Sequence, residues 1–146
     1  RIHKQLLEAE GSVVQDRSVY EDAEIFARNL YLQNLISPRD YGVYQDLYQI
    51  LISLLPPPNL VVYLRASVDT LLARIASRGR GFEASIPREY LVSLNALYEE
   101  WINTFTQCPV LIIPSDNLDL VAREAHISQV VQLVQDRLMG KTEITL

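Results

Sequence analysis

The sequence has a single cysteine, Cys108, which excludes a disulfide bond within the chain and agrees with a reducing compartment such as the cytoplasm. It also has no excess of basic residues, because 13 Lys and Arg against 18 Asp and Glu give a net charge of −5. A general nucleic-acid-binding protein needs basic side chains to neutralise phosphates, so we expect no nucleic-acid partner. No apolar run approaches the roughly 18 residues that a membrane-spanning helix needs, so we expect no membrane insertion.

Two kinds of binding motif are missing as well. The two histidines, His3 and His126, are isolated, and no Cys/His spacing indicates zinc, so we predict no metal-binding residues. A phosphate-binding loop of the form G-x-x-x-x-G-K-[ST] would follow a strand. The only Gly-Lys-Thr triplet, at residues 140–142, follows an expected helix, and Gln135 stands where the first glycine would be. The triplet is therefore not a phosphate cradle.

What the sequence does contain is an alternation of helical and strand patterns. Short β-prone runs predict strands at residues 12–15, 60–64 and 110–113. Apolar residues at helical spacing predict helices at residues 1–9, 20–36, 38–55, 68–78, 87–105 and 117–138. This order predicts a single α/β domain over residues 1–146, in three layers, with a parallel sheet between helices on both faces.

Charged and polar side chains follow each expected strand. Asp16 and Arg17 follow the first strand, Arg65 ends the second, and Ser115 and Asp116 follow the third. In open parallel sheets, ligands bind beyond the carboxyl ends of the strands. For Asp16 and Arg17 the structural explanation is a local ion pair at the sheet edge. The functional explanation is a carboxylate that positions or deprotonates a hydroxyl group, beside an arginine that holds a transferring phosphoryl group.

A second unusual feature is the arginine-rich stretch from Arg74 to Glu83. Arg74 and Arg78 share one helix face, where like charges repel by roughly 0.2–0.5 kcal/mol, and Arg80 follows at a glycine-flanked helix end. A bound anion would relieve this repulsion, because guanidinium forks match phosphate oxygens. A solvated basic helix end, favoured by the helix dipole, is the structural alternative. Together with the charged pair after the first strand, the stretch favours a phosphate site.

Three motifs resemble those of one family, the deoxyribonucleoside kinases. "DRSVYEDAEIFARNLY" (residues 16–31) resembles the family's E/D-R-S signature. "RIASRGRGFEASIPREYLVSLNALYEEW" (residues 74–101) looks like its arginine-rich lid, about residues 74–86, and the helix after it. "IPSDNLDLV" (residues 113–121) is similar to the loop that holds the donor adenine in bacterial deoxyadenosine and deoxyguanosine kinases. The resemblance runs from Arg1 to about Leu138.

The resemblance implies a P-loop kinase fold, which is Rossmann-like with a parallel sheet. Members transfer the γ-phosphoryl group of ATP, with Mg²⁺, to the 5′-hydroxyl of a deoxynucleoside in nucleotide salvage, and they usually form homodimers through a helix bundle. For this chain the resemblance therefore implies a deoxynucleoside kinase that prefers purines, deoxyadenosine or deoxyguanosine. Its expected partners are a deoxynucleoside, a nucleoside triphosphate and a second copy of the chain.

The resemblance also implies roles for individual residues. Asp16 and Arg17 would lie at the 5′-hydroxyl and the incoming phosphoryl group, and Arg78 would act with them. The other acceptor-site residues would bind the base edge (Arg1 and Asp22), the base face (Phe26) and the sugar 3′-hydroxyl (Glu83). The donor would be held at its phosphates and near its adenine by Arg74, Arg78, Arg80, Asp116, Asn117 and Leu118.

The sequence departs from the family pattern in two respects. The family's phosphate loop, its principal general base and its first two strands are expected upstream of Arg1, which leaves a sheet of about three strands and a fold incomplete at the N-terminus. Phe82 stands where some relatives carry a second acid. We therefore expect that this chain does not catalyse the reaction alone.

Two other functions fit the same fold. A non-catalytic accessory subunit gains nothing from facing like charges, so the arginines of the lid and of the E/D-R-S signature, together with Glu83, favour an enzyme. A thymidylate kinase-like enzyme would need a further basic group for the 5′-phosphate of its acceptor. Asp16 and Asp22 near the acceptor disfavour that second anion.

Overall fold

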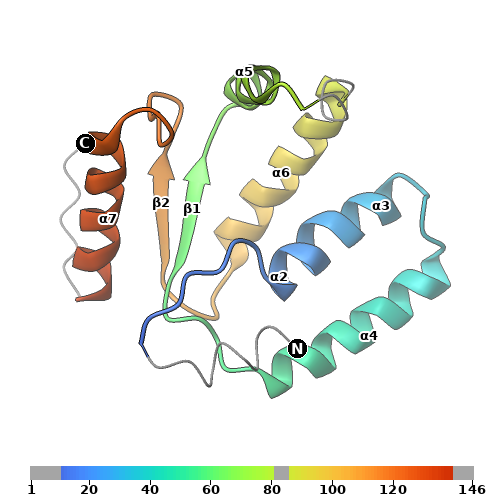
Figure 1. Cartoon of the computed structure of the whole chain (residues 1–146). Coiled ribbons are helices and arrows are strands. Elements are labelled where there is room, and N and C mark those ends of the chain that lie inside the picture. The colour runs from blue at the N-terminus through green and yellow to red at the C-terminus, as the bar shows by residue number, and fades with distance from the viewer. Residues whose placement is uncertain (1–10, 81–85, 140–146) are drawn as a thin grey trace. The chain divides into compact units, whose positions relative to one another are not determined.

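The structure is a computed structural model and describes residues 11–80 and 86–139 (Figure 1). Its backbone contacts divide into two compact units, Arg1–Pro57 and Pro58–Leu146. Within the described residues, no helix is both long and apolar enough to cross a membrane. The single domain over residues 1–146 stays a prediction.

Among the described residues of the first unit, regular structure begins with a continuous helical run; the helix predicted at residues 1–9 lies outside the described residues. Its middle is a π-helix, in which each turn holds an extra residue, and its ends are α-helical. The three segments are α2 (Val19–Glu21), η1 (Asp22–Ala27) and α3 (Arg28–Leu32). The side chains of Tyr20, Ala23, Ile25 and Ala27 are buried, so the run contributes most of the core of this unit.

The helical run ends at Leu32, earlier than residue 36, the end predicted from the sequence. Asn34 takes the left-handed backbone conformation, with φ of 57°. The N–H of Asn34 then donates to the Tyr31 carbonyl, and the N–H of Leu35 to the Leu30 carbonyl, each at 2.9 Å. This is a Schellman ending in which asparagine replaces the usual glycine.

Helix α4 (Pro38–Leu54) begins where the sequence predicts it. Ser37 caps the helix, because its Oγ accepts the N–H of Asp40 at 3.1 Å. The ring of Tyr41 stacks on that of Tyr31, with centroids 4.3 Å apart. This ring contact packs the first turn of α4 against α3.

The strand predicted at residues 12–15 does not form. These residues have no regular structure and are exposed, and Val14 is 97% accessible. A strand is stable only when a neighbour pairs with its backbone N–H and C=O groups. No described residue does so here, and the sheet has two strands among the described residues instead of about three.

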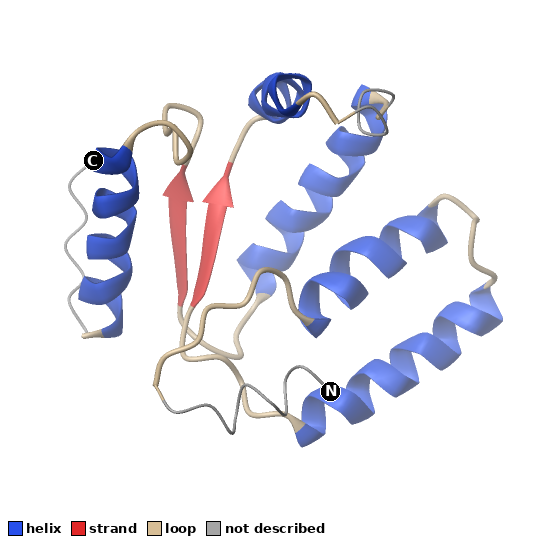
Figure 2. Ribbon diagram, in the orientation of Figure 1, coloured by secondary structure: helices blue, strands red, loops and turns tan. Residues whose placement is uncertain are grey.

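The second unit is built around a parallel two-stranded sheet (Figure 2). Its elements, in chain order, are β1 (Val61–Arg65), α5 (Val68–Arg78), α6 (Arg88–Thr104), β2 (Val110–Pro114) and α7 (Glu124–Leu138). Val61 pairs with Val110 at one end of the sheet, and Arg65 pairs with Pro114 at the other. The order of elements and the parallel pairing confirm the predicted α/β fold.

Helix α6 covers one face of this sheet. Tyr63 on β1 stacks on Tyr98 of α6, with ring centroids 5.8 Å apart. Val62 and Leu64 alternate with Tyr63 along the strand and so face the other way; they stay 38% and 41% exposed. That face of β1 is therefore only partly covered by the described residues. The buried apolar residues of α6 and β2 are Leu91, Leu97, Trp101, Ile102, Leu111 and Ile113.

The last helix begins later than the predicted residue 117. Helix α7 starts at Glu124, because a turn centred on Asp119 precedes it. The Asp119 carboxylate accepts the backbone N–H groups of Val121 at 3.0 Å and Ala122 at 2.8 Å. Such side-chain bonds compete with helix formation, so the helix cannot extend back to residue 117.

Candidate active site

The Asp16-Arg17-Ser18 segment leads directly into α2, and Ser18 has a structural role there. Ser18 caps the helix: its Oγ accepts the N–H of Tyr20 at 3.2 Å, and its own N–H donates to the Glu21 carboxylate at 2.8 Å. This reciprocal pair is a capping box. Glu21 is not among the predicted residues, although the Ser-x-x-Glu spacing that identifies the motif is visible in the sequence. The capping box fixes where Asp16 and Arg17 stand relative to the helix.

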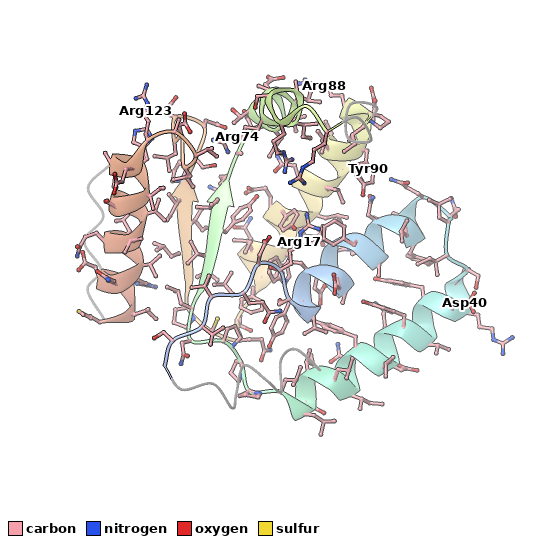
Figure 3. All side chains as sticks on the ribbon, viewed as in Figure 1. Arg17, Asp40, Arg74, Arg88, Tyr90 and Arg123 are labelled. Carbon is pink, nitrogen blue, oxygen red and sulfur yellow. The ribbon has the colours of Figure 1, made fainter. Side chains whose placement is uncertain are left out.

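Arg17 immediately precedes the capping residue Ser18 (Figure 3). Its backbone is in the left-handed conformation, with φ of 62°. Its guanidinium carbon lies 4.8 Å from the ring centroid of Phe26, a cation–π contact. The structure therefore brings together two residues that the sequence predicts for the acceptor site. Asp16, beside Arg17, is exposed.

The π-helical segment η1 carries two of the predicted site residues, Asp22 and Phe26. Asp22 is exposed, Phe26 is half-buried and Ile25 between them is fully buried. A π-helical turn is rare and occurs often at functional sites, where it changes the direction of side chains. The π-helical backbone of η1 therefore favours this segment as the ligand-binding part of the first unit.

A buried hydroxyl–carboxylate contact holds η1 on α4. Tyr48 of α4 is buried, and its hydroxyl bonds to the carboxylate of Glu24 on η1. Burial raises the pKa of Tyr48 above its ordinary value, and the nearby negative charge of Glu24 adds to this shift. The hydroxyl therefore stays protonated and can donate to Glu24, which fixes one side of the π-helical segment.

In the second unit, hydrogen bonds from Ser115 join the ends of the two strands. Ser115, just after β2, donates through its backbone N–H at 2.7 Å and through its Oγ at 3.0 Å to the carbonyl of Arg65, the last residue of β1. Ser115 is almost completely buried. The loop that follows, residues 115–118, thus starts from a fixed point at the carboxyl edge of the sheet.

Arg74 of α5 binds this loop (Figure 3). Its Nη2 donates to the backbone carbonyl of Ser115 and, at 2.8 Å, to that of Leu118, and its Nη1 lies 3.4 Å from the Ser115 Oγ. The role of Arg74 at donor phosphates stays a prediction; in the structure its guanidinium holds the loop that was predicted to lie near the donor adenine.

Asp116 makes a second connection between the loop and α5. Its Oδ1 accepts the N–H of Ser67 at 2.7 Å, and Ser67 is the cap of α5. Hydrogen bonds from the Ser67 N–H and from Thr70 hold the pKa of Asp116 below its usual range. The carboxylate therefore stays charged at neutral pH and keeps its place at the positive end of the helix dipole.

An ion pair joins β1 to α6. Arg65 donates to both carboxylate oxygens of Glu99, each at 2.8 Å, and the Tyr63 hydroxyl donates to the same carboxylate at 3.1 Å. Burial, and then the charge of Glu99, raises the pKa of Tyr63. Glu99 is not among the predicted residues. It lies 34 residues from Arg65 in the sequence, so no local pattern could have identified the pair.

Arg78 and Arg80 lie at the carboxyl end of α5, where both are exposed. Arg78 is the last helical residue, and Gly79 ends the helix in the left-handed conformation with φ of 64°. This confirms the predicted glycine break. The other two predicted residues of the acceptor site, Arg1 and Glu83, lie outside the described residues.

Among residues 11–80 and 86–139, no group of three or more His, Cys, Asp or Glu side chains could hold a metal ion. A magnesium ion in kinase sites is usually bound by one or two carboxylates together with the phosphates of the substrate. The described residues therefore offer no separate metal centre.

Comparison with known proteins identifies relatives over most of the chain. The model of the family described as deoxynucleoside kinase matches residues 1–139. The chain is 35% identical over 133 residues to the deoxyadenosine/deoxycytidine kinase of Bacillus subtilis (strain 168), covering 90% of this chain and 61% of that protein. The deoxyguanosine kinase of the same organism is 30% identical over 125 residues, covering 83% and 60%. The chain thus spans about three fifths of the length of these curated relatives.

Solved structures show the same fold. A deoxyadenosine kinase from M. mycoides with bound dATP superposes with a TM-score of 0.71 at 31% identity, over 90% of this chain and 66% of that one. The same enzyme with the products dCMP and a flexible dCDP gives a TM-score of 0.74 at 28% identity, over 93% and 68%. The α/β fold with its parallel sheet is therefore the fold of these kinases.

Proposed function

Because the chain belongs to the deoxynucleoside kinase family, we propose that the protein transfers the γ-phosphoryl group of ATP to the 5′-hydroxyl of a deoxynucleoside. The family match over residues 1–139 is the observation that carries this proposal. The relatives' names include kinases of deoxyadenosine and deoxyguanosine, which support a purine acceptor here. The reaction would return deoxynucleosides to the nucleotide pool, as a salvage step in the cytoplasm.

We propose that the acceptor binds at the start of the helical run in the first unit. Asp16 would position or deprotonate the 5′-hydroxyl, and Arg17 would hold the incoming phosphoryl group. Asp22 and Phe26 on the π-helical segment would bind the edge and the face of the base, since an aromatic ring offers a stacking surface. The contact of Arg17 with Phe26 supports this grouping, because it places a cation beside the proposed base site.

We propose that the donor binds at the carboxyl edge of the sheet in the second unit. Arg78 and Arg80 would hold its phosphates, and the loop of Asp116, Asn117 and Leu118 would lie near its adenine. Mg²⁺ would bind with the triphosphate. The exposure of both arginines at a helix end, where they can reach a ligand, supports this assignment.

Two residues outside the described ranges complete the proposed acceptor site. Arg1 would pair with Asp22 over the base edge, and Glu83 would accept a hydrogen bond from the sugar 3′-hydroxyl. A site that is built to accept this hydrogen bond rejects a sugar without the hydroxyl, because the carboxylate is then left unpaired.

An assay of the complete protein encoded by the gene tests the proposed reaction. The protein is incubated with ATP, Mg²⁺ and each of the four deoxynucleosides, with dTMP as a control acceptor. We expect deoxyadenosine or deoxyguanosine 5′-monophosphate to form together with an equal amount of ADP. Phosphorylation of dTMP alone would indicate a monophosphate kinase, and no transfer to any acceptor would indicate an accessory subunit.

We also propose that the protein is a homodimer that forms through α4. This helix carries an apolar stripe of Val43, Leu47, Ile50 and Leu54, at successive spacings of four, three and four residues. All four side chains are more than half exposed. Residues at this spacing lie on one helix face, so a second copy of the same stripe could cover them in a symmetric contact.

A further inference from the structure

The loop at residues 115–118 is a closed turn that one guanidinium spans. The N–H of Leu118 donates to the Ser115 carbonyl at 3.0 Å, which closes the turn. The Nη2 of Arg74 donates to the carbonyls of Ser115 and Leu118, the first and last residues of the turn. The two hydrogens of Nη2 have fixed directions in the guanidinium plane, so this one NH2 group can serve both carbonyls at once, whereas the ammonium of a lysine rotates on a flexible stem and fixes neither direction.

The same loop is connected to α5 at a second point. The Asp116 carboxylate accepts the N–H of Ser67, at the start of α5, at 2.7 Å. Arg74 lies seven residues further along the same helix, and Arg78 lies four residues beyond Arg74. The loop is therefore fastened to the helix at two places, roughly two turns apart. Movement of the loop relative to α5 would break charge-assisted hydrogen bonds at both places.

We propose that Arg74 and Asp116 form a brace that fixes the loop at residues 115–118 against α5, and that Arg74 is a positioning residue for the base of the donor rather than a ligand of its phosphates. The inference rests on the proposed function, in which this loop lies near the donor base and Arg78 holds the phosphates. The brace sets the distance between these two parts of the donor site, because the loop and Arg78 are then held on one helix.

The contacts of Arg74 distinguish this role from phosphate binding. To reach a phosphate, Nη2 would have to release two partly buried carbonyl groups, which would then lose their charged donor. Arg78 and Arg80 are exposed at the end of the same helix. The two tasks are therefore divided along α5: its middle holds the loop, and its carboxyl end meets the phosphates.

Two substitutions in the complete protein separate the two roles. Arg74→Lys keeps the charge but loses the fork, and Arg74→Gln removes the charge. For each variant we would measure KM and kcat with ATP, GTP and UTP, and the inhibition constant of inorganic tripolyphosphate, which has phosphates but no base. Hydrogen exchange of the Leu118 amide reports on the loop independently of activity. Arg137→Lys in α7 is the control for the substitution itself, and Arg78→Gln is the contrasting variant.

If the brace exists, both Arg74 variants raise KM for ATP by about tenfold, equivalent to the loss of one hydrogen-bonded contact. Both variants also reduce the differences in KM between ATP, GTP and UTP. Both also exchange the Leu118 amide faster, while kcat at saturating ATP and tripolyphosphate inhibition stay unchanged. Arg78→Gln, in contrast, weakens inhibition by tripolyphosphate.

Two results would overturn the brace. If inhibition by tripolyphosphate follows the charge, so that it is lost in Arg74→Gln and kept in Arg74→Lys, Arg74 is a phosphate ligand. Unchanged exchange at Leu118 in both variants also overturns the brace. If the unmutated protein phosphorylates no deoxynucleoside, the proposed function fails, and the exchange of Leu118 alone decides whether the brace exists.

Discussion

Arg17 combines a left-handed backbone conformation with a cation–π contact. Its backbone is left-handed, which costs a non-glycine residue on the order of 1 kcal/mol. Its guanidinium carbon lies 4.8 Å from the centroid of the Phe26 ring. The capping box of Ser18 and Glu21 directly after it supplies the local structure that holds this conformation. A functional reason for the strained backbone is that this conformation orients the guanidinium toward the proposed phosphoryl group.

Replacing Arg17 by lysine tests that role. Lysine keeps the positive charge and meets the same backbone strain, but it lacks the planar fork that binds two phosphoryl oxygens. We expect kcat of the complete protein to fall by about 100-fold, as when a transition-state donor is removed, with little change in the dissociation constant of the deoxynucleoside. Steady-state kinetics and calorimetric binding measure the two quantities. Arg39→Lys at the exposed start of α4 is the matched control, and a kcat equal to that of the control would remove Arg17 from the transfer step.

Ser18 is expected to matter for stability. Ser18→Ala removes the hydroxyl that accepts the Tyr20 N–H and donates to the Glu21 carboxylate, while the backbone N–H of residue 18 can still donate to Glu21. The free energy of unfolding should decrease by about 1 kcal/mol, the usual cost of losing an N-cap. Urea denaturation followed by circular dichroism measures it. The control Ser128→Ala, at an exposed site within α7, should lower the free energy of unfolding by less than half as much. An equal decrease in the two variants would show that the cap does not stabilise the protein more than an ordinary exposed serine does.

At the scale of elements, the contact between η1 and α4 depends on a protonated tyrosine. Burial and the charge of Glu24 raise the pKa of Tyr48 in the folded protein. The unfolded chain loses this proton near pH 10, and the folded chain keeps it. The unfolded state therefore binds fewer protons above that pH, and the free energy of unfolding falls as the pH rises through this range.

Tyr48→Phe should change this alkaline behaviour. At pH 8, the loss of a buried hydrogen bond should cost about 1 kcal/mol. Between about pH 9 and pH 11, the decline in the free energy of unfolding should become shallower but not vanish, because one group with a raised pKa is gone while Tyr41, Tyr44 and Tyr63, whose pKa values are also raised, remain. Urea titrations at several pH values measure both effects. A decline as steep as that of the unmutated protein would show that Tyr48 does not contribute to it.

The elements also show which features a sequence can predict. Helix ends that depend on neighbouring residues were predictable, as at Ser37, Ser67 and Gly79, because a cap or a left-handed glycine acts within one turn. The prediction of a strand at residues 12–15 was wrong, because a strand needs a pairing partner that the local sequence does not specify. The late start of α7 follows from the side-chain bonds of Asp119, which an apolar pattern does not reveal.

The candidate site divides in the same way. The positions of Arg65 and Asp116 at the ends of β1 and β2 were predictable, because each follows a β-prone run in the sequence, whereas Asp16 and Arg17 follow no strand. The partners of these residues were not, because the guanidinium of Arg74 could bind a phosphate or a carbonyl equally well on chemical grounds. Only the position of Ser115 and Leu118 in the fold shows that it holds the loop.

At the scale of the whole molecule, the apolar stripe of α4 is the feature that the described residues leave without a partner of matching character. Val43, Leu47, Ile50 and Leu54 are each more than half exposed. Burying such a side chain fully contributes roughly 1.5–3 kcal/mol, so a stripe covered by its own copy can sustain a dimer. A charge placed in that contact would be desolvated without a partner and would oppose association.

The double variant Leu47→Asp/Leu54→Asp of the complete protein tests this dimer. Both positions are exposed, so the fold of the single chain should survive, and circular dichroism would confirm it. Size-exclusion chromatography with light scattering should give twice the chain mass for the unmutated protein and the single-chain mass for the variant at the same concentration. Val131→Asp, at an exposed apolar site on α7, is the control and should remain dimeric. A dimer that persists in the double variant would place the interface elsewhere, and a monomeric unmutated protein would mean that the stripe has another occupant.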